Sequence, residues 1–416
     1  FQPEWSPGGA LHFVSDRSGW WNIYRRSASG DVPLALMEAE FGHPQWVFGM
    51  RRYRFLPDGR IAAIYQVDGL FKLGIIGVDG MRDIPLDRDD LAPVIAVASG
   101  KVWLVAGGPA LADAVIGVDP ETGEYVVVRE AMSVELDSGY VSRPEPISFP
   151  TTGGAVAHAF YYPPTNPDFL PLDGELPPLV VFSHGGPTSA TTSGLRLSIQ
   201  YWTSRGFALV DVNYRGSTGY GRAYREALKG QWGIVDTEDC IAAAEYLASR
   251  GVVDRDRMAI RGGSAGGYTT LCALTFHDVF ATGASYYGVA DCESLATDTH
   301  KFESRYLDGL IGPYPEAVDV YRQRSPVRHT DRLSRPMIIL QGLDDRVVPP
   351  DQAEQMVSAL DEKGIAYTYL AFEGEGHGFR GADTIERAAE AELSFYAWVF
   401  GFVPAGDIRP AEIRNA

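Results

Sequence analysis

The stretch MAIRGGSAGGYTTLCAL, from Met258 to Leu274, joins a short apolar run to a helix-like run through four glycines, one alanine and one serine. Glycine inside a regular element costs about 0.5–1 kcal/mol relative to alanine, so this density of glycine needs a local reason. A sharp turn from a strand into a helix is such a reason, because it lifts the serine hydroxyl above the sheet and leaves no space for larger neighbours. We therefore interpret Ser264, in the pattern G-x-S-x-G, as a candidate nucleophile.

The length and composition of the chain predict a globular protein with two domains. It has 416 residues, of which 45% are hydrophobic and 22% charged, and this length exceeds what one hydrophobic core usually serves. The formal net charge of −18 argues against nucleic acid or an anionic membrane as a partner, because both would repel the chain. No apolar run approaches the roughly 18 residues of a membrane span.

Cysteine usage and the start of the chain carry less information. Cys240, Cys272 and Cys292 are too few for a disulfide framework and lack metal-ligand spacing, so we expect buried or inert thiols. No signal peptide is visible, but the chain opens on Phe1 rather than methionine, within what looks like a repeat. We expect a truncated fragment and a cytoplasmic location.

The first part of the chain, residues 1–136, has the pattern of short strands and turns. A turn at Pro7–Gly9 precedes a strand over Ala10–Ser15, and a second strand covers Trp20–Arg25. The same scheme restarts at Pro44 and, more weakly, at Pro93.

The repeats predict blades of a propeller. Trp5, Trp46 and Ile95 are interpreted as equivalent positions, and their spacing of about 40–50 residues fits one four-stranded blade per repeat. Three blades cannot close a ring, so we expect a partial propeller. An all-β sandwich is the alternative.

After a Pro-, Ser- and Gly-rich stretch at residues 137–154, read as linker and entry strand, the pattern changes. Short continuous apolar runs suit parallel strands with both faces covered, and helical patterns lie between them. The expected strands are Leu179–Ser183, Phe207–Asn213, Met258–Arg261, Gly283–Tyr287, Met337–Gln341 and Tyr367–Phe372. We expect an α/β domain over residues 155–403, with a doubly wound, mostly parallel sheet, and a C-terminal tail over 404–416.

Three candidate catalytic residues follow three of these strands. Ser264 follows one strand, Asp344 and Asp345 follow another, and His377 lies among glycines after the last strand. Ligands on such sheets bind at the carboxyl ends of the strands, where these residues would meet. The chain order Ser, Asp, His is that of α/β-hydrolases, and His377 would act as the base.

An oxyanion hole would complete this site. One N–H donor is expected from Ala265, which follows the nucleophile at the start of a helix. The other is expected from Gly186 in the glycine turn after the first strong strand, and an ordinary turn is the alternative there. His184, in the same turn, is read as structural.

These segments together resemble the prolyl oligopeptidase family of serine peptidases, particularly its acylaminoacyl-peptidase and dipeptidyl-aminopeptidase-like branch. The matching stretches are SHGGPTS, VNYRGSTGYGRAYREA, GGSAGGY, QGLDDRVVPP and GEGHGF, in family order. The resemblance implies an α/β-hydrolase fold preceded by a β-propeller that restricts access to short peptides. It implies no metal or organic cofactor and no nucleic acid or membrane partner, and it leaves the oligomeric state open.

The resemblance also bears on the acid and on substrate contacts. It favours Asp345 as the acid, with Asp344 as the alternative. Relatives often carry a substrate-binding Arg or Asn two positions after the acid, but that position is Val347 here, which makes a substrate role of the neighbouring Arg346 doubtful.

Four further residues are candidate substrate contacts. Relatives bind the free N-terminus of the substrate with propeller carboxylates, for which Glu38 and Glu40 are available, although an ordinary solvated loop is the favoured interpretation of each. Tyr287 and Val289 could line the pocket for the residue before the scissile bond, and core packing accounts for them equally well. The sequence thus predicts a serine peptidase for short peptides, with a carboxylesterase and a non-catalytic interaction protein as alternatives.

Overall fold

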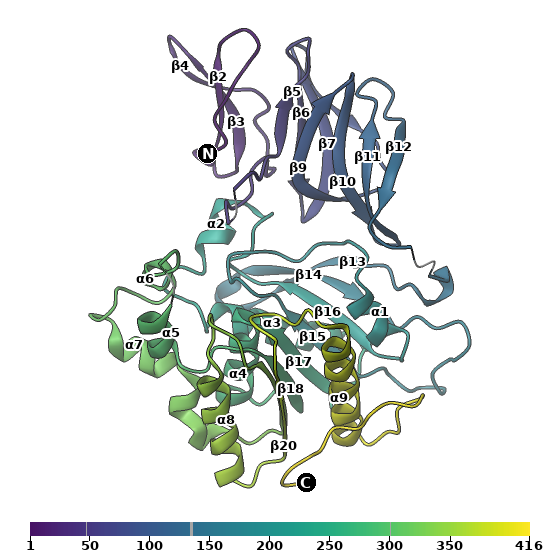
Figure 1. Ribbon diagram of the computed structural model, residues 1–416, viewed down its shortest axis with the longest axis vertical. Coiled ribbons are helices and arrows are strands. Elements are labelled where there is room, and N and C mark those ends of the chain that lie inside the picture. Colours follow the sequence, from purple (N-terminus) through teal and green to yellow (C-terminus); the bar gives the residue numbers. More distant parts are fainter. Residues whose placement is uncertain (47, 134–135, 300) are drawn as a thin grey trace. The chain divides into compact units, whose positions relative to one another are not determined.

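The structure is a computed structural model that describes residues 1–46, 48–133, 136–299 and 301–416 (Figure 1). The chain divides into two compact units. The N-terminal unit comprises residues 1–144, 190–200 and 217–226, and the C-terminal unit comprises residues 145–189, 201–216 and 227–416.

Within the described residues, the N-terminal unit contains three sheets of four antiparallel strands each, in which every strand pairs with the next along the chain. The first sheet consists of β1 (Glu4–Trp5), β2 (Leu11–Ser15), β3 (Asn22–Ser27) and β4 (Gly30–Pro33). The second consists of β5 (Tyr53–Phe55), β6 (Ile61–Val67), β7 (Leu70–Gly77) and β8 (Gly80–Ile84). The third consists of β9 (Asp90–Ala98), β10 (Lys101–Gly108), β11 (Leu111–Val118) and β12 (Tyr125–Glu130).

The predicted equivalence of Trp5, Trp46 and Ile95 is wrong in detail. Trp5 lies in β1 and Ile95 in β9, but Trp46 lies in the long connection between β4 and β5, ahead of the first strand of the second sheet. The register pairs Trp5 with Leu11 and Phe55 with Ile61, so Phe55 holds the place of Trp5. The long connection between β4 and β5 shifts the second repeat along the chain, so equal spacing pointed to Trp46 instead of Phe55.

Apolar clusters fill the space between neighbouring sheets of this unit. One cluster joins the first and second sheets through side chains such as Ile23 and Tyr65. Another joins the second and third sheets through side chains such as Leu73 and Ile116. Face-to-face packing of four-stranded sheets confirms the predicted partial propeller.

The C-terminal unit is built on one eight-stranded sheet with the order β13-β14-β16-β15-β17-β18-β19-β20. Its strands are β13 (Glu145–Pro150), β14 (Val156–Tyr162), β15 (Leu179–Ser183), β16 (Ala208–Asn213), β17 (Met258–Gly263), β18 (Thr282–Tyr286), β19 (Met337–Gly342) and β20 (Tyr367–Phe372). The pairs β13–β14 and β14–β16 are antiparallel, and the remaining pairs are parallel. The predicted α/β class and mostly parallel sheet are therefore confirmed.

Helices connect the strands of this sheet. The α-helices along the chain are α1 (Leu197–Thr203), α2 (Gly221–Glu226), α3 (Val235–Ser249), α4 (Ala265–Phe276), α5 (Cys292–Asp298), α6 (Tyr306–Leu310), α7 (Val318–Arg324), α8 (Pro350–Glu362) and α9 (Ala382–Phe400). Short 3-10 helices are η1 (Ser138–Tyr140), η2 (Thr152–Gly154) and η3 (Pro326–Arg332). None of the helices in the described part of the chain combines the length and the apolar character that crossing a membrane requires.

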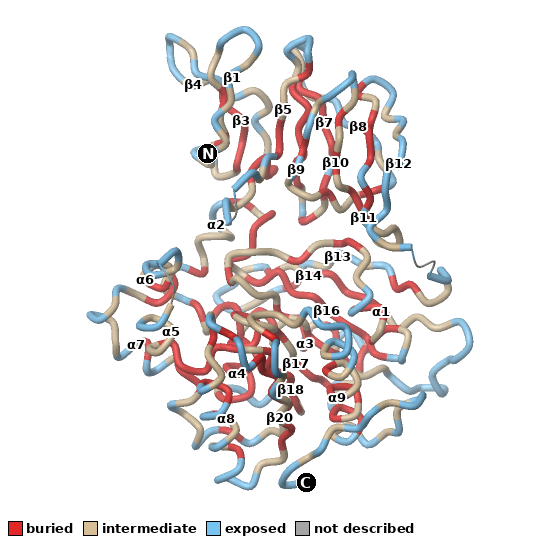
Figure 2. Tube along the Cα trace, viewed as in Figure 1, coloured by how far each residue is buried: buried red, intermediate tan, exposed pale blue. Residues whose placement is uncertain are grey.

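The two faces of the sheet are covered by different helices (Figures 1 and 2). Side chains of α3, α4 and α8 pack on the face that carries Ile260. The next residue, Arg261, points to the opposite face, where it meets Trp202 of α1 and Glu392 of α9. The central strands β15, β16, β18 and β19 are buried almost throughout, as the continuous apolar runs predict, whereas the edge strand β20 is partly exposed.

The strand order reverses at β15, and this reversal places the site. The chain runs from β15 outward to β16 and then returns to the other side of β15 to form β17. The loops after β15 and β17 therefore leave the same edge of the sheet side by side, which is where α/β sheets bind their ligands.

All three cysteines lie in the C-terminal unit, and all three are buried and free. Burial raises the pKa of the Cys240 and Cys272 thiols well above the ordinary value and that of Cys292 to about 12. The thiolate is the reactive form, so these thiols are unreactive at neutral pH.

Candidate active site

Ser264 occupies a strained turn between β17 and α4. Its backbone angles are φ 56° and ψ −120°, in a region that residues with a side chain rarely adopt. The flanking glycines are sterically required: a Cβ on Gly262 would lie 2.4 Å from the carbonyl carbon of Gly266, and a Cβ on Gly266 would lie 2.1 Å from the oxygen of Ser183. Close packing of strand, turn and helix therefore explains the glycines and holds the serine at the edge of the sheet.

Gly266→Ala is expected to destabilise the fold by about 1–3 kcal/mol, because the added methyl group collides with backbone rather than with a movable side chain. Urea unfolding would measure the loss. Gly309→Ala in α6 is the matched control, since a Cβ there meets no atom within 4 Å. Equal stability of the two variants would contradict the close packing of the turn.

A continuous hydrogen-bonded chain joins Ser264, His377 and Asp345. The distance from His377 Nε2 to Ser264 Oγ is 2.8 Å, and the distance from His377 Nδ1 to Asp345 Oδ2 is also 2.8 Å. A carboxylate only accepts, so Nδ1 donates to Asp345, and the neutral ring then accepts the serine proton at Nε2. The three residues follow β17, β19 and β20 at one edge of the sheet.

Asp345, not its neighbour, carries this contact. Its side chain is fully buried, and its Oδ1 accepts from the N–H groups of Val347 and Val348 at 2.8 and 2.9 Å. Asp344 is exposed and donates its own N–H to the oxygen of Glu375. The sequence left both aspartates as candidates for the acid, and the structure places Asp345 against His377.

The loop that carries His377 is closed by a carboxylate that the sequence analysis missed. Glu375 accepts from the N–H groups of Arg380 and Gly381 at 2.9 and 2.8 Å, and these backbone donors, Arg380 first, lower its pKa. The loop also packs on β19, since a Cβ on Gly342 would lie 2.5 Å from the oxygen of Glu375. The stretch GEGHG offers one carboxylate among glycines, and this was the available signal.

A second missed group lies beneath Ser264. Arg261 forms a 3.0 Å ion pair with the fully buried Glu392, which also accepts from the hydroxyl of Tyr286 at 2.5 Å. The backbone oxygen of Tyr286 accepts from the N–H of Ser264 at 3.0 Å. An arginine inside the apolar strand and a glutamate on the apolar face of α9 were the signals for this pair.

Both predicted oxyanion segments lie close to the serine. Ala265 is the first residue of α4, so its N–H has no acceptor within the helix. A Cβ on Gly185 would lie 3.6 Å from the Cβ of Ser264, and Gly186 follows with φ 51°. His184 stacks on Tyr214 with ring centroids 4.2 Å apart, which agrees with a structural rather than a catalytic role.

Tyr287 meets the triad, whereas Val289 and Arg346 do not. The ring of Tyr287 contacts that of His377 at 5.1 Å, and its backbone has φ 37°. Burial is the main cause that raises the pKa of its hydroxyl. Val289 is buried in an apolar cluster that includes Ala265, and Arg346 is exposed.

Glu40 lies inside the N-terminal unit rather than in a solvated loop. Only 1% of it is exposed, and its carboxylate accepts from the N–H groups of Trp21 and Gly221 at 2.9 and 3.1 Å. Arg225 lies 3.6 Å away, and burial is the main cause that raises the pKa of Glu40. The favoured sequence interpretation is therefore wrong for Glu40, while Glu38 is exposed as expected.

This arrangement can perform acyl transfer. It offers a hydroxyl with an adjacent base, a buried carboxylate that orients the base, and N–H groups beside the place where negative charge would develop. Every participating group is supplied by the C-terminal unit.

The sequence of the chain is similar to those of known peptidases. The chain is 36% identical to dipeptidyl aminopeptidase BIII of Pseudoxanthomonas mexicana, over 49% of this chain and 30% of the relative. It is 30% identical to the acylamino-acid-releasing enzyme of Arabidopsis thaliana, over 54% of this chain and 30% of the relative. Both alignments thus span about a third of the length of the relative.

A solved structure extends the match to the whole chain. A puromycin-hydrolyzing peptidase of Mycobacterium tuberculosis is 45% identical, with a TM-score of 0.96, over 100% of this chain and 63% of that one. The family model described as the prolyl oligopeptidase family matches residues 193–402. The family model covers half of the sequence, and the solved structure shares the fold over the whole chain: the chain belongs to the prolyl oligopeptidase family.

Proposed function

We propose that the protein is a serine peptidase that hydrolyses short peptides through an acyl-enzyme intermediate. The observation that carries this proposal is the unbroken chain of hydrogen bonds from Ser264 through His377 to Asp345. The similarity to a dipeptidyl aminopeptidase, an acylamino-acid-releasing enzyme and a puromycin-hydrolyzing peptidase supports peptides and related amides as substrates.

In the proposed reaction, Ser264 Oγ attacks the carbonyl carbon while its proton passes to Nε2 of His377. The N–H groups of Gly186 and Ala265 stabilise the negative oxygen of the tetrahedral intermediate. His377 then gives its proton to the leaving amine, and the acyl group stays on Ser264. Water, deprotonated by His377, attacks this ester, and His377 gives that proton to the departing Ser264 Oγ as the acid is released. Asp345 keeps Nδ1 protonated throughout and stabilises the imidazolium.

The experiment that tests the function compares three substrates. These are an aminoacyl anilide with a free amine, its N-acetylated counterpart, and a short-chain ester, with the Ser264→Ala variant as background. Turnover of either anilide supports a peptidase, and the preferred anilide distinguishes an aminopeptidase from an acylaminoacyl or internally cleaving peptidase. Turnover of the ester alone would replace the proposal with a carboxylesterase, and turnover of none would favour a non-catalytic interaction protein.

Glu40→Gln tests whether this carboxylate binds the free amine of a substrate. Glu40 is already held by two backbone N–H groups and by Arg225, so we expect kcat/KM for the free and acetylated anilides to change by the same factor. A loss of about tenfold confined to the free anilide would instead assign Glu40 to substrate binding. Thermal unfolding of the variant would separate either effect from loss of fold.

Two narrower statements are part of the proposal. The partners are short peptides, with no nucleic acid or membrane partner, which the net charge of −18 supports. A cytoplasmic location is proposed together with them.

A further inference from the structure

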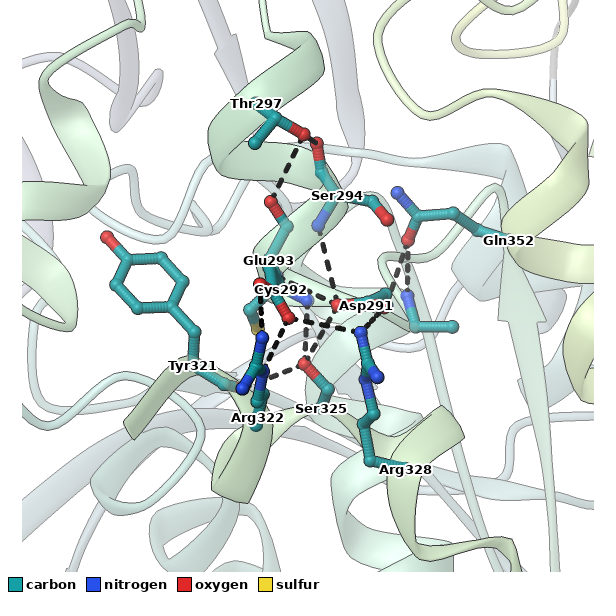
Figure 3. Close-up of polar contacts among 11 residues, drawn as sticks. Asp291, Cys292, Glu293, Ser294, Thr297, Tyr321, Arg322, Ser325, Arg328 and Gln352 are labelled. Atoms are coloured by element: carbon teal, nitrogen blue, oxygen red, sulfur yellow. Dashed lines mark hydrogen bonds and ion pairs between the residues drawn. The ribbon is translucent and has the colours of Figure 1, made fainter. Parts of the chain in front are cut away.

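The loop after β18, which we call the Tyr287–Asp291 loop, is fixed by polar contacts from Ser325, from Arg328 of η3 and from Gln352 of α8 (Figure 3). Asp291 begins α5 as its N-cap, and its carboxylate accepts from the hydroxyl of Ser325 at 3.2 Å and from Arg328 at 3.1 Å. Ser325 in turn accepts from the N–H of Cys292 at 2.9 Å. These contacts hold the far end of the loop.

One side chain of α8 also holds the last two residues of the loop. The amide oxygen of Gln352 accepts from two consecutive N–H groups, those of Ala290 at 2.8 Å and Asp291 at 3.0 Å. Gln352 is 2% exposed, so these N–H groups are shielded from water that could replace it. A buried N–H without an acceptor is costly, and the loop would have to move to find another.

Gln352 also connects the loop to the acid of the triad. The turn from Asp345 to Val348 is tightened by the aspartate side chain itself, and α8 begins at Pro350 directly after it. The side chain of Gln341 donates to the oxygen of Val348 at 3.1 Å and anchors this turn to β19. The position of Gln352 is therefore set by the same turn that holds Asp345.

The near end of the loop reaches the reacting groups. The ring of Tyr287 contacts the ring of His377, and a Cβ on Gly263 would lie 3.0 Å from the hydroxyl of Tyr287. The strained φ of 37° at Tyr287 persists only while the surrounding loop holds it. Gly288 packs on Gly267 in the first turn of α4, since a Cβ on Gly267 would lie 2.6 Å from the Cα of Gly288. Small movements of the loop thus act on the surroundings of Ser264 and His377.

We infer that Gln352 is a positioning residue: by fixing the Tyr287–Asp291 loop to the helix that follows Asp345, it sets the wall that receives the substrate residue before the scissile bond. The inference rests on the proposed peptidase function. Gln352 contacts the loop through the backbone, so it shapes the wall without touching the substrate. Its removal changes how well large residues are accepted more than it changes the chemistry at Ser264.

The test compares two variants. Gln352→Met keeps the length of the side chain but removes the acceptor oxygen, whereas Gln352→Glu keeps both. Anilides with phenylalanine and with alanine before the scissile bond are the substrates. We expect Gln352→Met to lower kcat/KM for the phenylalanine anilide about tenfold relative to the alanine anilide, mainly through KM. Gln352→Glu is expected to restore the wild-type ratio to within about threefold, because a carboxylate at the start of a helix accepts the same N–H groups.

A matched control separates positioning from general destabilisation. Gln200 is also a buried glutamine that accepts a backbone N–H, that of Ser142 at 2.8 Å, but it lies in the N-terminal unit. Gln200→Met should lower the melting temperature and leave the phenylalanine-to-alanine ratio unchanged. Gln352→Asn, whose amide is drawn back by one carbon, provides the same comparison if Gln352→Met does not fold.

The outcomes distinguish the inference from the function on which it rests. An unchanged ratio in the Gln352 variants, or a Gln352→Glu variant as impaired as Gln352→Met, would overturn the positioning role while wild-type peptidase activity stands. A wild-type protein that cleaves neither anilide would overturn the proposed function and the inference with it.

Discussion

Ser264→Ala is expected to lower kcat for a peptide anilide by about 10⁶-fold, to the level of the oxyanion hole and substrate binding alone. The variant removes the atom that His377 Nε2 contacts at 2.8 Å, and among the described residues no other hydroxyl hydrogen-bonds to His377. Anilide hydrolysis under conditions of excess substrate measures the loss. Thermal unfolding should show a stable protein, because alanine keeps the Cβ at this strained position.

Ser358→Ala is the matched control for this result, since Ser358 is an exposed serine whose hydroxyl donates to the oxygen of Glu354 within its own helix, α8. It should retain wild-type turnover. If Ser264→Ala kept more than about a hundredth of the activity, the acyl-enzyme mechanism through Ser264 would fall.

Asp345→Asn is expected to lower kcat by about 10⁴-fold, whereas Asp344→Asn should remain within about threefold of wild type. Asparagine offers an NH₂ group where His377 needs an acceptor, so the ring is held in the wrong tautomer. Asp344, one residue earlier, is exposed and supplies no contact to His377. The measurement is the pH dependence of kcat for both variants and the wild type.

The outcome of this pair decides which aspartate acts. Similar losses in both variants would mean that disturbing the turn, rather than losing the carboxylate, lowers the rate. A larger loss in Asp344→Asn would reassign the acid and contradict the hydrogen-bonding pattern.

The core of the fold was predictable because apolar runs and strand ends carry their own signals. The runs Leu179–Ser183 and Tyr367–Phe372 match β15 and β20 at both ends. The Ser264 turn was predictable because glycine is required wherever a backbone approaches another backbone closely, and four glycines mark that place. Because the parallel strands end at the same edge of the sheet, the sequence also indicated that His377 lies near Ser264.

Other parts of the site left no comparable trace in the sequence. Adjacent aspartates cannot be separated by pattern, because the choice between Asp344 and Asp345 depends on which side chain turns inward beside Val347 and Val348. Gln352 accepts from backbone N–H groups, which every residue type except proline supplies, so no partner motif in the sequence indicates its role. Glu40 was misread because its burial depends on Gly221, which is far from it along the chain.

The three buried thiols make this protein suited to chemical labelling. Cys240, Cys272 and Cys292 are shielded from solvent and keep their protons, so a maleimide reagent would leave the native chain unmodified. A single cysteine introduced at an exposed position such as Arg346 would then take up one fluorophore, with no prior removal of native cysteines. Because Arg346 directly follows Asp345, that fluorophore would be attached beside the turn that carries the acid.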